Sequence, residues 1–207
     1  MNNRNYQREL DFIIKENTER KVRPSLLLHV CCAPCSSYVQ EYLQDYFDIT
    51  LLFYNPNMDS AGEYEHRSRE LERLVAEAGY ASKVVICRYD PENYADISRG
   101  FEEEPEGGVR CRRCYELRMR KAAEYASARG YDYYTTTLSI SPYKNADWIN
   151  EIGEKLAVEY NIKHLTSDFK KRNGYKRSIE LSKEYNLYRQ DYCGCRMSRK
   201  GREGEMK

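Results

Sequence analysis

The sequence predicts an α/β fold in which helices cover both faces of a parallel sheet. Short, continuously apolar runs alternate along the chain with long amphipathic helical patterns, and this alternation is typical of a buried parallel sheet. The chain has 207 residues, enough for one domain with a sizeable core. No internal repeat or low-complexity segment interrupts the alternation. We therefore expect a single α/β domain over 1–207, with a C-terminal extension made of a helix and a cysteine loop.

In the first half of the chain, helical and apolar patterns alternate three times. Leu10, Ile13 and Ile14 fall on one face of an N-terminal amphipathic helix. The runs SLLLHV, DITLLFY and KVVICRY predict buried strands. Ser36 or Ser37 can cap the helix between the first two strands, and AGEYEHRSRELERLVAEAGY predicts the helix after the second. These elements span 5–20, 26–30, 36–47, 48–54, 62–78 and 83–89.

The second half continues the alternation. A helix beginning at Pro91 precedes an acidic, glycine-containing loop, EEEPEGG. The pattern CYELRMRKAAEYASARG predicts a strong helix that begins at Cys114 and is ended by Gly130. The runs YDYYTTTLSI and KHLTS predict the last two strands, with the helix NADWINEIGEKLAVEY between them. A final helix precedes the loop QDYCGC. These elements span 91–100, 114–130, 131–140, 145–160, 163–167 and 175–186.

The net charge is +1, but the charges are distributed unevenly. Residues 163–202 hold 12 Lys or Arg against 4 Asp or Glu, which indicates a basic face on an otherwise acidic protein. Tyrosines alternate with cations in this segment, and that pattern suits an unpaired nucleotide, although a solvated basic tail has the same composition. The candidate nucleic-acid contacts are Lys170, Lys171, Arg172, Lys176, Arg177, Tyr188 and Arg189. Within the domain, we expect an N-terminal helix in 1–22, the basic segment in 166–200 and a flexible tail in 201–207.

The N-terminal residues are charged throughout and lack the apolar centre of a signal peptide. No stretch approaches the length of about 18 apolar residues that a membrane span needs. We therefore expect a cytoplasmic protein with no membrane contact. In that reducing compartment, the eight cysteines are expected to bind metal or take part in catalysis rather than to form a disulfide framework.

Seven of the cysteines fall into three groups. HVCCAPC places Cys31, Cys32 and Cys35 directly after the first strand, where parallel sheets bind ligands. The other two groups are a CxxC pair, Cys111 and Cys114, and a CxC pair, Cys193 and Cys195. The remaining cysteine, Cys87, lies in an apolar strand and is expected to be a small core residue.

Two kinds of metal site compete for these thiols. Structural zinc usually takes two short-spaced pairs, but adjacent cysteines are too close to form half of a zinc knuckle, and zinc leaves three thiols unexplained. An iron–sulfur cluster takes four thiolates from separate segments. Arginines around the CxxC, and helices expected to open at Ser36 and Cys114, stabilise negative charge there. We therefore favour a 4Fe-4S cluster, with the ligands Cys31, Cys32, Cys111 and Cys114.

The sequence Cys193-Gly194-Cys195 suggests a different role. Two thiols at this spacing can approach disulfide distance, and the small ring makes such a disulfide easily reduced. Gly194 gives the backbone freedom for the turn. A redox-active pair fits this pattern, but so does a second metal site, or one cluster ligand beside an uninvolved thiol.

Four sequence blocks, taken together and in order, resemble the cobalamin-independent epoxyqueuosine reductase family. They are HVCCAPC, CRRCYELRMRKAA, LSISPYKN and GYKRSIELSKEYNLYRQDYCGC, and the resemblance runs from about residue 25 to residue 198. It implies an α/β fold related to the adenine-nucleotide hydrolase group. Those hydrolase relatives that form adenylates carry SGGxDS after the first strand, where this chain has CCAPCSS, so ATP chemistry is disfavoured.

The resemblance also implies the reaction, namely reductive removal of the epoxide oxygen of epoxyqueuosine at the wobble position of tRNA, the last step of queuosine synthesis. It implies a 4Fe-4S cluster on Cys31, Cys32, Cys111 and Cys114 with an iron beside it, and a redox-active pair in Cys193 and Cys195. Cys35 stands where some family members have aspartate, and it is a candidate ligand of the second iron. The partner is the anticodon loop of tRNA, and the electron donor is unknown.

Deoxygenation of an epoxide needs two electrons and two protons, so a one-electron cluster requires a second redox centre. A thiol or Asp191 is a candidate proton source. Two alternative functions remain open from the residues, a zinc-stabilised RNA-binding module and an iron–sulfur tRNA thiolase. The thiolase is disfavoured because SGGxDS is absent.

Overall fold

The computed structural model of the chain describes residues 4–199. Its centre is a five-stranded, all-parallel sheet in the order β3-β2-β1-β4-β5, which confirms the predicted α/β class. The strands are β1 (Ser25–Val30), β2 (Asp48–Phe53), β3 (Lys83–Ile86), β4 (Tyr133–Thr136) and β5 (Lys163–His164). The tail predicted for 201–207 lies outside the described residues, as does residue 200.

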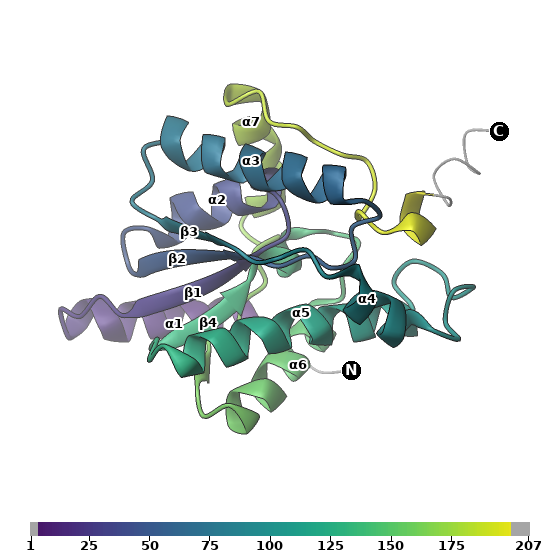
Figure 1. The fold of residues 1–207 in the computed structure, drawn as a ribbon. Coiled ribbons are helices and arrows are strands. Elements are labelled where there is room, and N and C mark those ends of the chain that lie inside the picture. The colour runs from purple at the N-terminus through teal and green to yellow at the C-terminus, as the bar shows by residue number, and fades with distance from the viewer. Residues whose placement is uncertain (1–3, 200–207) are drawn as a thin grey trace.

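Helices cover both faces of this sheet (Figure 1). They are α1 (Tyr6–Glu19), α2 (Ala33–Leu43), α3 (Ala61–Glu77), α4 (Pro91–Ser98), α5 (Val109–Ala128), α6 (Ala146–Glu159) and α7 (Gly174–Glu184). A short 3₁₀ helix, η1 (Thr137–Ile140), follows β4 directly. No described helix is both long and apolar enough to cross a membrane.

Two hydrophobic clusters lie on opposite faces of the sheet because successive side chains of a strand point to opposite sides. Leu26, Leu28 and Val30 of β1 belong to the cluster that α1, α2 and α3 cover. Leu27 belongs to the other cluster, which α5 and α6 cover. Alanines let α5 approach the sheet closely, and they are Ala122, Ala123 and Ala126. The helix α7 packs against α2.

Two helices begin earlier than predicted, and both differences change the position of cysteines. The helix α2 begins at Ala33, with Cys32 as its N-cap, so the prediction of Ser36 or Ser37 as the cap was wrong. Pro34 in the first turn favours this start. The helix α5 begins at Val109, not at Cys114, because the preceding glycines end the acidic loop and Gly108 becomes the N-cap.

Three strands are shorter than predicted. The run 131–140 forms a strand only over Tyr133–Thr136, because the Thr136 hydroxyl accepts a hydrogen bond from the Leu138 N–H (3.2 Å) and turns the chain into η1. The strand expected over 83–89 ends at Ile86, and the one expected over 163–167 ends at His164.

The strand order creates a ligand position beside β1. The chain passes from β1 to β2 and β3 on one side, and later to β4 and β5 on the other. The carboxyl ends of β1 and β4 therefore border a topological switch point, where α/β sheets bind ligands. The backbone N–H of Cys31, just after β1, donates to the Thr137 hydroxyl, just after β4 (3.2 Å).

His29 holds these two strand ends together. Its Nε2–H donates to the Tyr54 carbonyl oxygen (3.0 Å), so Nδ1 accepts the Thr136 hydroxyl (2.8 Å). Burial lowers the pKa of His29 to about 4, and the nearby Arg118 acts in the same direction. The imidazole is therefore neutral at neutral pH and is packed within the sheet.

Candidate active site

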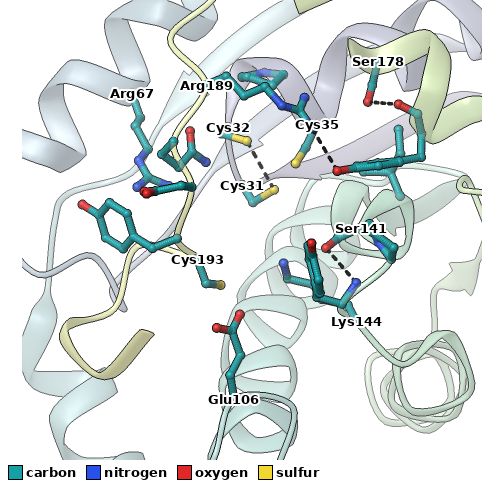
Figure 2. Close-up of a pocket in the computed structure, with 18 residues that line it drawn as sticks. Cys31, Cys32, Cys35, Arg67, Glu106, Ser141, Lys144, Ser178, Arg189 and Cys193 are labelled. Atoms are coloured by element: carbon teal, nitrogen blue, oxygen red, sulfur yellow. Dashed lines mark hydrogen bonds between the residues drawn. The ribbon is translucent and has the colours of Figure 1, made fainter. Parts of the chain in front are cut away.

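A cavity of about 300 Å³ opens at the carboxyl ends of β1 and β4. Figure 2 shows that it is bordered by the start of α2, the loop after η1 and the C-terminal segment that follows α7. Cysteines and cations line the same cavity, together with tyrosines and carboxylates. The residues that matter below are Cys31, Cys32, Cys35, Arg67, Glu106, Lys144, Tyr175, Arg189, Asp191, Tyr192 and Cys193.

Cys31, Cys32 and Cys35 form one compact group of sulfur atoms. All three Sγ atoms lie within 4.8 Å of one another, and those of Cys31 and Cys32 are 3.9 Å apart. The strand end places Cys31, the N-cap places Cys32, and the first turn of α2 brings Cys35 back beside them. Within residues 4–199, no other set of three Cys, His or acidic side chains brings its ligand atoms this close. The geometry suits a metal ion.

The three thiols do not hold their protons equally. Hydrogen bonds from Cys32 and then Cys35 lower the pKa of Cys31 well below its ordinary value, against the effect of burial, and Lys144 and Thr137 add to the lowering. The hydrogen bond between Cys32 and Cys31 raises the pKa of Cys32 to about 12. The hydrogen bond between Cys35 and Cys31 raises the pKa of Cys35 well above its ordinary value. In the metal-free group, Cys31 therefore loses its proton more readily than Cys32 or Cys35, and a metal would replace the protons of all three.

The CxxC pair lies within α5 rather than at its first residue. Cys111 is in the first turn, where its Sγ accepts the Gly107 N–H (3.3 Å). Cys114, one turn later, is buried, and burial raises the pKa of its thiol to about 12. The positive end of the helix thus lies closer to Cys111 than to Cys114, and the expectation that Cys114 opens the helix was wrong.

The CxC pair is held by a short hydrogen-bonded loop. Gly194 has a φ of +112°, a conformation that favours glycine, and its carbonyl oxygen accepts the Asp59 N–H (3.0 Å). The Cys195 Sγ accepts the Ser198 N–H (3.4 Å), and the Cys193 N–H donates to the Ser198 hydroxyl (3.1 Å). All eight cysteines are free thiols in this structure.

Folding brings the CxC pair to the CxxC pair. After burial, the charges of Cys193 and Cys195 are the main groups that raise the pKa of Cys111 through space. The same two charges raise the pKa of Cys114. Cys193 also lines the cavity beside the compact group. All seven predicted cysteines thus gather at one end of the sheet, although the compact three-sulfur group contains Cys35 and neither residue of the CxxC.

A buried arginine interacts electrostatically with the thiols of the site. Arg118 is 1% exposed, and its Nη1 donates to the Asn55 side-chain oxygen (3.1 Å). Its Nε and Nη2 have no hydrogen-bond partner among the described residues. The thiols of Cys114, Cys193 and Cys31, in that order, act against desolvation to raise its pKa. Because a buried cation is costly without an anion, a metal–thiolate group with net negative charge fits these residues.

Arg67 fixes the wall that carries the CxC loop. It is 2% exposed, pairs with Glu63 (2.6 Å), and lies 5.2 Å from the centre of the Tyr192 ring. A Cβ on Gly194 would come within 3.3 Å of the guanidinium, so glycine allows the close approach. No pattern in the sequence predicted roles for Arg67, Arg118 or Lys144, although Arg118 and Lys144 fall within blocks that resemble the family.

Several predicted nucleic-acid contacts are engaged within the protein. Lys170 pairs with Asp168 (2.7 Å), Arg172 with Asp11, and Arg177 with Glu41 (2.6 Å). The Arg189 guanidinium lies over the Tyr175 ring, 5.5 Å from the ring centre, and donates a hydrogen bond to the Tyr175 hydroxyl (3.2 Å). The Tyr188 ring packs edge-on against the His66 ring, with 4.4 Å between the ring centres. The remaining two residues, Lys171 and Lys176, are exposed and form no ion pair with other residues in 4–199.

The sequence model that matches this chain is described as "Epoxyqueuosine reductase QueH" and covers residues 26–201. This chain belongs to the epoxyqueuosine reductase QueH family. A QueH protein from Streptococcus pyogenes serotype M1 is 45% identical over 195 residues, which cover 92% of this chain and 76% of that protein. A QueH protein from Staphylococcus epidermidis is 43% identical over 197 residues, which cover 92% of this chain and 83% of that protein. One from Thermotoga maritima is 33% identical over 83% and 88% of the two chains.

Membership confirms the resemblance inferred from the four blocks. The matched residues, 26–201, include every cysteine of the site and the loop that carries Lys144. The cavity at the switch point is therefore the candidate active site of a QueH reductase, and its compact thiol group is a candidate metal site.

Proposed function

We propose that this chain removes the epoxide oxygen of epoxyqueuosine at the wobble position of tRNA and thereby completes queuosine biosynthesis. One observation carries the proposal. Cysteines from two distant segments, Cys31–Cys35 and Cys193, line one cavity at the switch point of an α/β sheet, and the CxC loop brings the CxxC pair close to it, in a chain that belongs to the QueH family. The reaction consumes two electrons and two protons for each alkene and water formed. Redox-active sulfur and metal chemistry, which this cavity can hold, is what such a reaction needs.

The proposed cofactor is a 4Fe-4S cluster with an additional iron. Cys31, Cys32, Cys111 and Cys114 would hold the cluster, and Cys35 would be available to the second iron. When bound, this group supplies electrons one at a time and a Lewis acid for the epoxide oxygen. The donor set supports it, because the thiols of Cys114, Cys193 and Cys31 act on the buried Arg118 and its Nε and Nη2 have no hydrogen-bond partner among the described residues. Cys193 and Cys195 are proposed as the redox-active pair.

The chain's own residues prepare the cavity for the base. Tyr175 and Arg189 form a stacked pair at its edge, and such planes receive unpaired bases. The wobble base lies in an anticodon loop that is already single-stranded, so little base pairing is lost when it enters. Exposed cations just before and within the first turn of α7, Lys171 and Lys176, would hold phosphates. Because the substrate is tRNA, we propose that the enzyme works in the cytoplasm.

The test is an anaerobic assay with tRNA that carries epoxyqueuosine. The protein is purified without oxygen, its iron, sulfide and zinc are measured, and a chemical reductant is added. We expect a brown protein with iron and sulfide, and nucleosides lighter by one oxygen atom. A colourless zinc protein that binds tRNA but leaves the epoxide intact would favour the RNA-binding module. Transfer of sulfur to the tRNA would favour a thiolase.

A further inference from the structure

Lys144 occupies a distinctive place in the cavity. It follows η1 in a tight turn, in which its backbone N–H donates to the Ser141 carbonyl oxygen (3.2 Å). Its side chain is half-buried and lines the cavity below the three sulfurs in Figure 2. Of the described residues that line the cavity, it is the only lysine. The turn thus projects one flexible, primary ammonium group toward the place where a substrate would meet the thiols.

The other cations of the cavity are occupied by protein groups. Arg67 pairs with Glu63 and stacks on Tyr192, and Arg189 binds Tyr175. Lys144 Nζ, in contrast, forms no hydrogen bond or ion pair with another residue in 4–199. The groups that act on it most strongly through space are the thiols of Cys193, Cys31 and Cys35, followed by the Tyr115 hydroxyl. Against desolvation, they keep its pKa above the ordinary value. Lys144 therefore stays protonated and has three N–H donors available.

We propose that Lys144 is a catalytic residue that donates a hydrogen bond, and then a proton, to the epoxide oxygen of the substrate. This inference rests on the proposed function and adds the proton donor to it. The geometry supports it because an epoxide brought close enough to the thiols to be reduced would place its oxygen within reach of the same cavity wall.

The proton has a defined place in the reaction. An electron pair from the reductant enters the substrate, both carbon–oxygen bonds of the epoxide break, and a carbon–carbon double bond forms between the two ring carbons. The oxygen takes one proton from Lys144 Nζ and a second from water, and leaves as water. Solvent then reprotonates the amine. An alkoxide is a much stronger base than an amine, so transfer from the ammonium runs downhill even when thiolates stabilise its charge.

The carboxylates of the cavity are weaker candidates. Glu106 accepts the Ser198 hydroxyl (2.9 Å) and so belongs to the CxC loop. Asp191, named from the sequence beside a thiol as a candidate proton source, is exposed to solvent. Neither is among the charged groups that act on Lys144. The competing role for Lys144 is that of a counter-charge that only stabilises thiolates, and the experiment must separate the two.

The experiment compares Lys144→Met, Lys144→Arg and Lys144→Ala with the wild-type protein in single-turnover assays on tRNA bearing epoxyqueuosine. Iron and sulfide content, the midpoint potential and tRNA affinity are measured on the same samples. We expect Lys144→Met to react roughly 10²–10⁴-fold more slowly, with wild-type iron, sulfide and tRNA affinity. Lys144→Arg keeps the charge but is a poor acid, so it should stay slow. Methylammonium should accelerate Lys144→Ala, whereas tetramethylammonium, which has no N–H, should not.

Lys83→Met is the matched control, because Lys83 is exposed at the opposite, amino-terminal edge of the sheet. It should react at the wild-type rate. Full activity in Lys144→Arg, equal rescue by both ammonium ions, or loss of iron in Lys144→Met would overturn the proposal and leave the counter-charge role. A wild-type rate in Lys144→Met would overturn it outright. If the wild-type protein forms no queuosine, the proposed function fails, and the role of Lys144 fails with it.

Discussion

At the scale of single residues, the buried Arg118 supports the proposal that the thiols bind an anionic metal group. It lies in α5 among residues that pack against the sheet, such as Tyr115, Met119 and Ala122. Its guanidinium donates a hydrogen bond to Asn55, and its other two nitrogens have no hydrogen-bond partner among the described residues. A methionine of similar length would pack there without the cost of a buried charge. The arginine is understandable if a negatively charged metal–thiolate group completes its environment.

We therefore expect Arg118→Met to retain several-fold less iron and sulfide than the wild-type protein, while the metal-free protein unfolds at an equal or higher temperature. Both effects follow from removal of the buried charge. Metal analysis and thermal melts of the metal-free protein check them. Arg120→Met is the control, because Arg120 lies on the same helix but pairs with Glu116 at the surface. Wild-type metal content in Arg118→Met would remove the electrostatic argument for the cofactor.

At the scale of elements, α3 fastens the C-terminal segment that forms one wall of the cavity. Arg73 donates to the carbonyl oxygens of Tyr185 (3.0 Å) and Asn186 (3.1 Å), and the Tyr188 N–H donates to Glu70 (2.7 Å). Glu70 also pairs with Arg73 (2.6 Å). These bonds fix the start of the segment that carries Arg189, Tyr192 and the CxC pair.

The Glu70 attachment predicts a specific pH dependence. Hydrogen bonds from Arg73 and then the Tyr188 N–H hold the pKa of Glu70 below its usual value. Because the folded pKa is depressed, this stabilisation is complete above the unfolded value of 4.5 and is lost as pH falls through the folded value. We expect Glu70→Gln to lower the free energy of unfolding at neutral pH by about 1–3 kcal/mol. Urea unfolding should show this difference shrinking below pH 4.5.

Glu77→Gln separates the attachment from a general loss of charge. Glu77 binds the same Arg73 (2.7 Å) but makes no hydrogen bond to residues 185–193, so its replacement should cost less. Hydrogen exchange over residues 185–193 should accelerate in Glu70→Gln alone. Equal exchange in the two variants would show that α3 does not fasten this segment.

The CxC loop is the second element that predicts an outcome. Its thiols face the cavity and α5, and its backbone is fixed through Gly194 and Ser198. If Cys193 and Cys195 form a redox pair, serine at either position should preserve the visible absorption and tRNA binding but slow turnover strongly. Absorption spectra, tRNA titration and the nucleoside assay measure these three properties. Cys87→Ser, which replaces a cysteine outside the cavity lining, is the control and should turn over normally. Loss of absorption in Cys193→Ser would identify a metal ligand instead.

At the scale of the whole molecule, internal ion pairs leave fewer free cations for tRNA than the composition suggests. Lys170 and Arg172 are paired, whereas Lys171 and Lys176 are not. We expect Lys171→Gln and Lys176→Gln each to reduce the slope of log K against log salt for tRNA binding by about 1. Lys170→Gln, the matched control beside them, should change the slope less because its charge is already neutralised. Equal slopes in all three variants would place the phosphate contacts elsewhere.

Local patterns predicted the sheet well because the signal of a buried strand is contained in its own residues. SLLLHV and DITLLF are apolar on both faces, and both form strands. Helix starts were harder, because Cys32 caps α2 through its extended backbone and without a side-chain hydrogen bond. Such a cap cannot be recognised from the type of side chain. The start of α5 was misplaced in the same way: the prediction put it at Cys114, whereas the helix begins at Val109 after the N-cap Gly108, which has no side chain.

The candidate site was predictable in its thiols but not in its cations. HVCCAPC stands out because three cysteines follow a strand. Lys144 and Arg118 look like ordinary charges until folding places β4 beside β1 and α5 beneath them. Their environment depends on contacts between segments more than a hundred residues apart, such as Cys31 with Thr137. Such long-range contacts cannot be predicted from the spacing of residues along the chain.

The central claim is that the chain reduces an epoxide within tRNA, and an electron count tests it most directly. The anaerobic protein, with saturating tRNA that bears epoxyqueuosine, is titrated with a limiting chemical reductant, and queuosine is measured in the digested tRNA. The account predicts one queuosine for every electron pair delivered, and none without reductant. Queuosine formed without consumption of electrons, or electrons consumed while the epoxide stays intact, would contradict it.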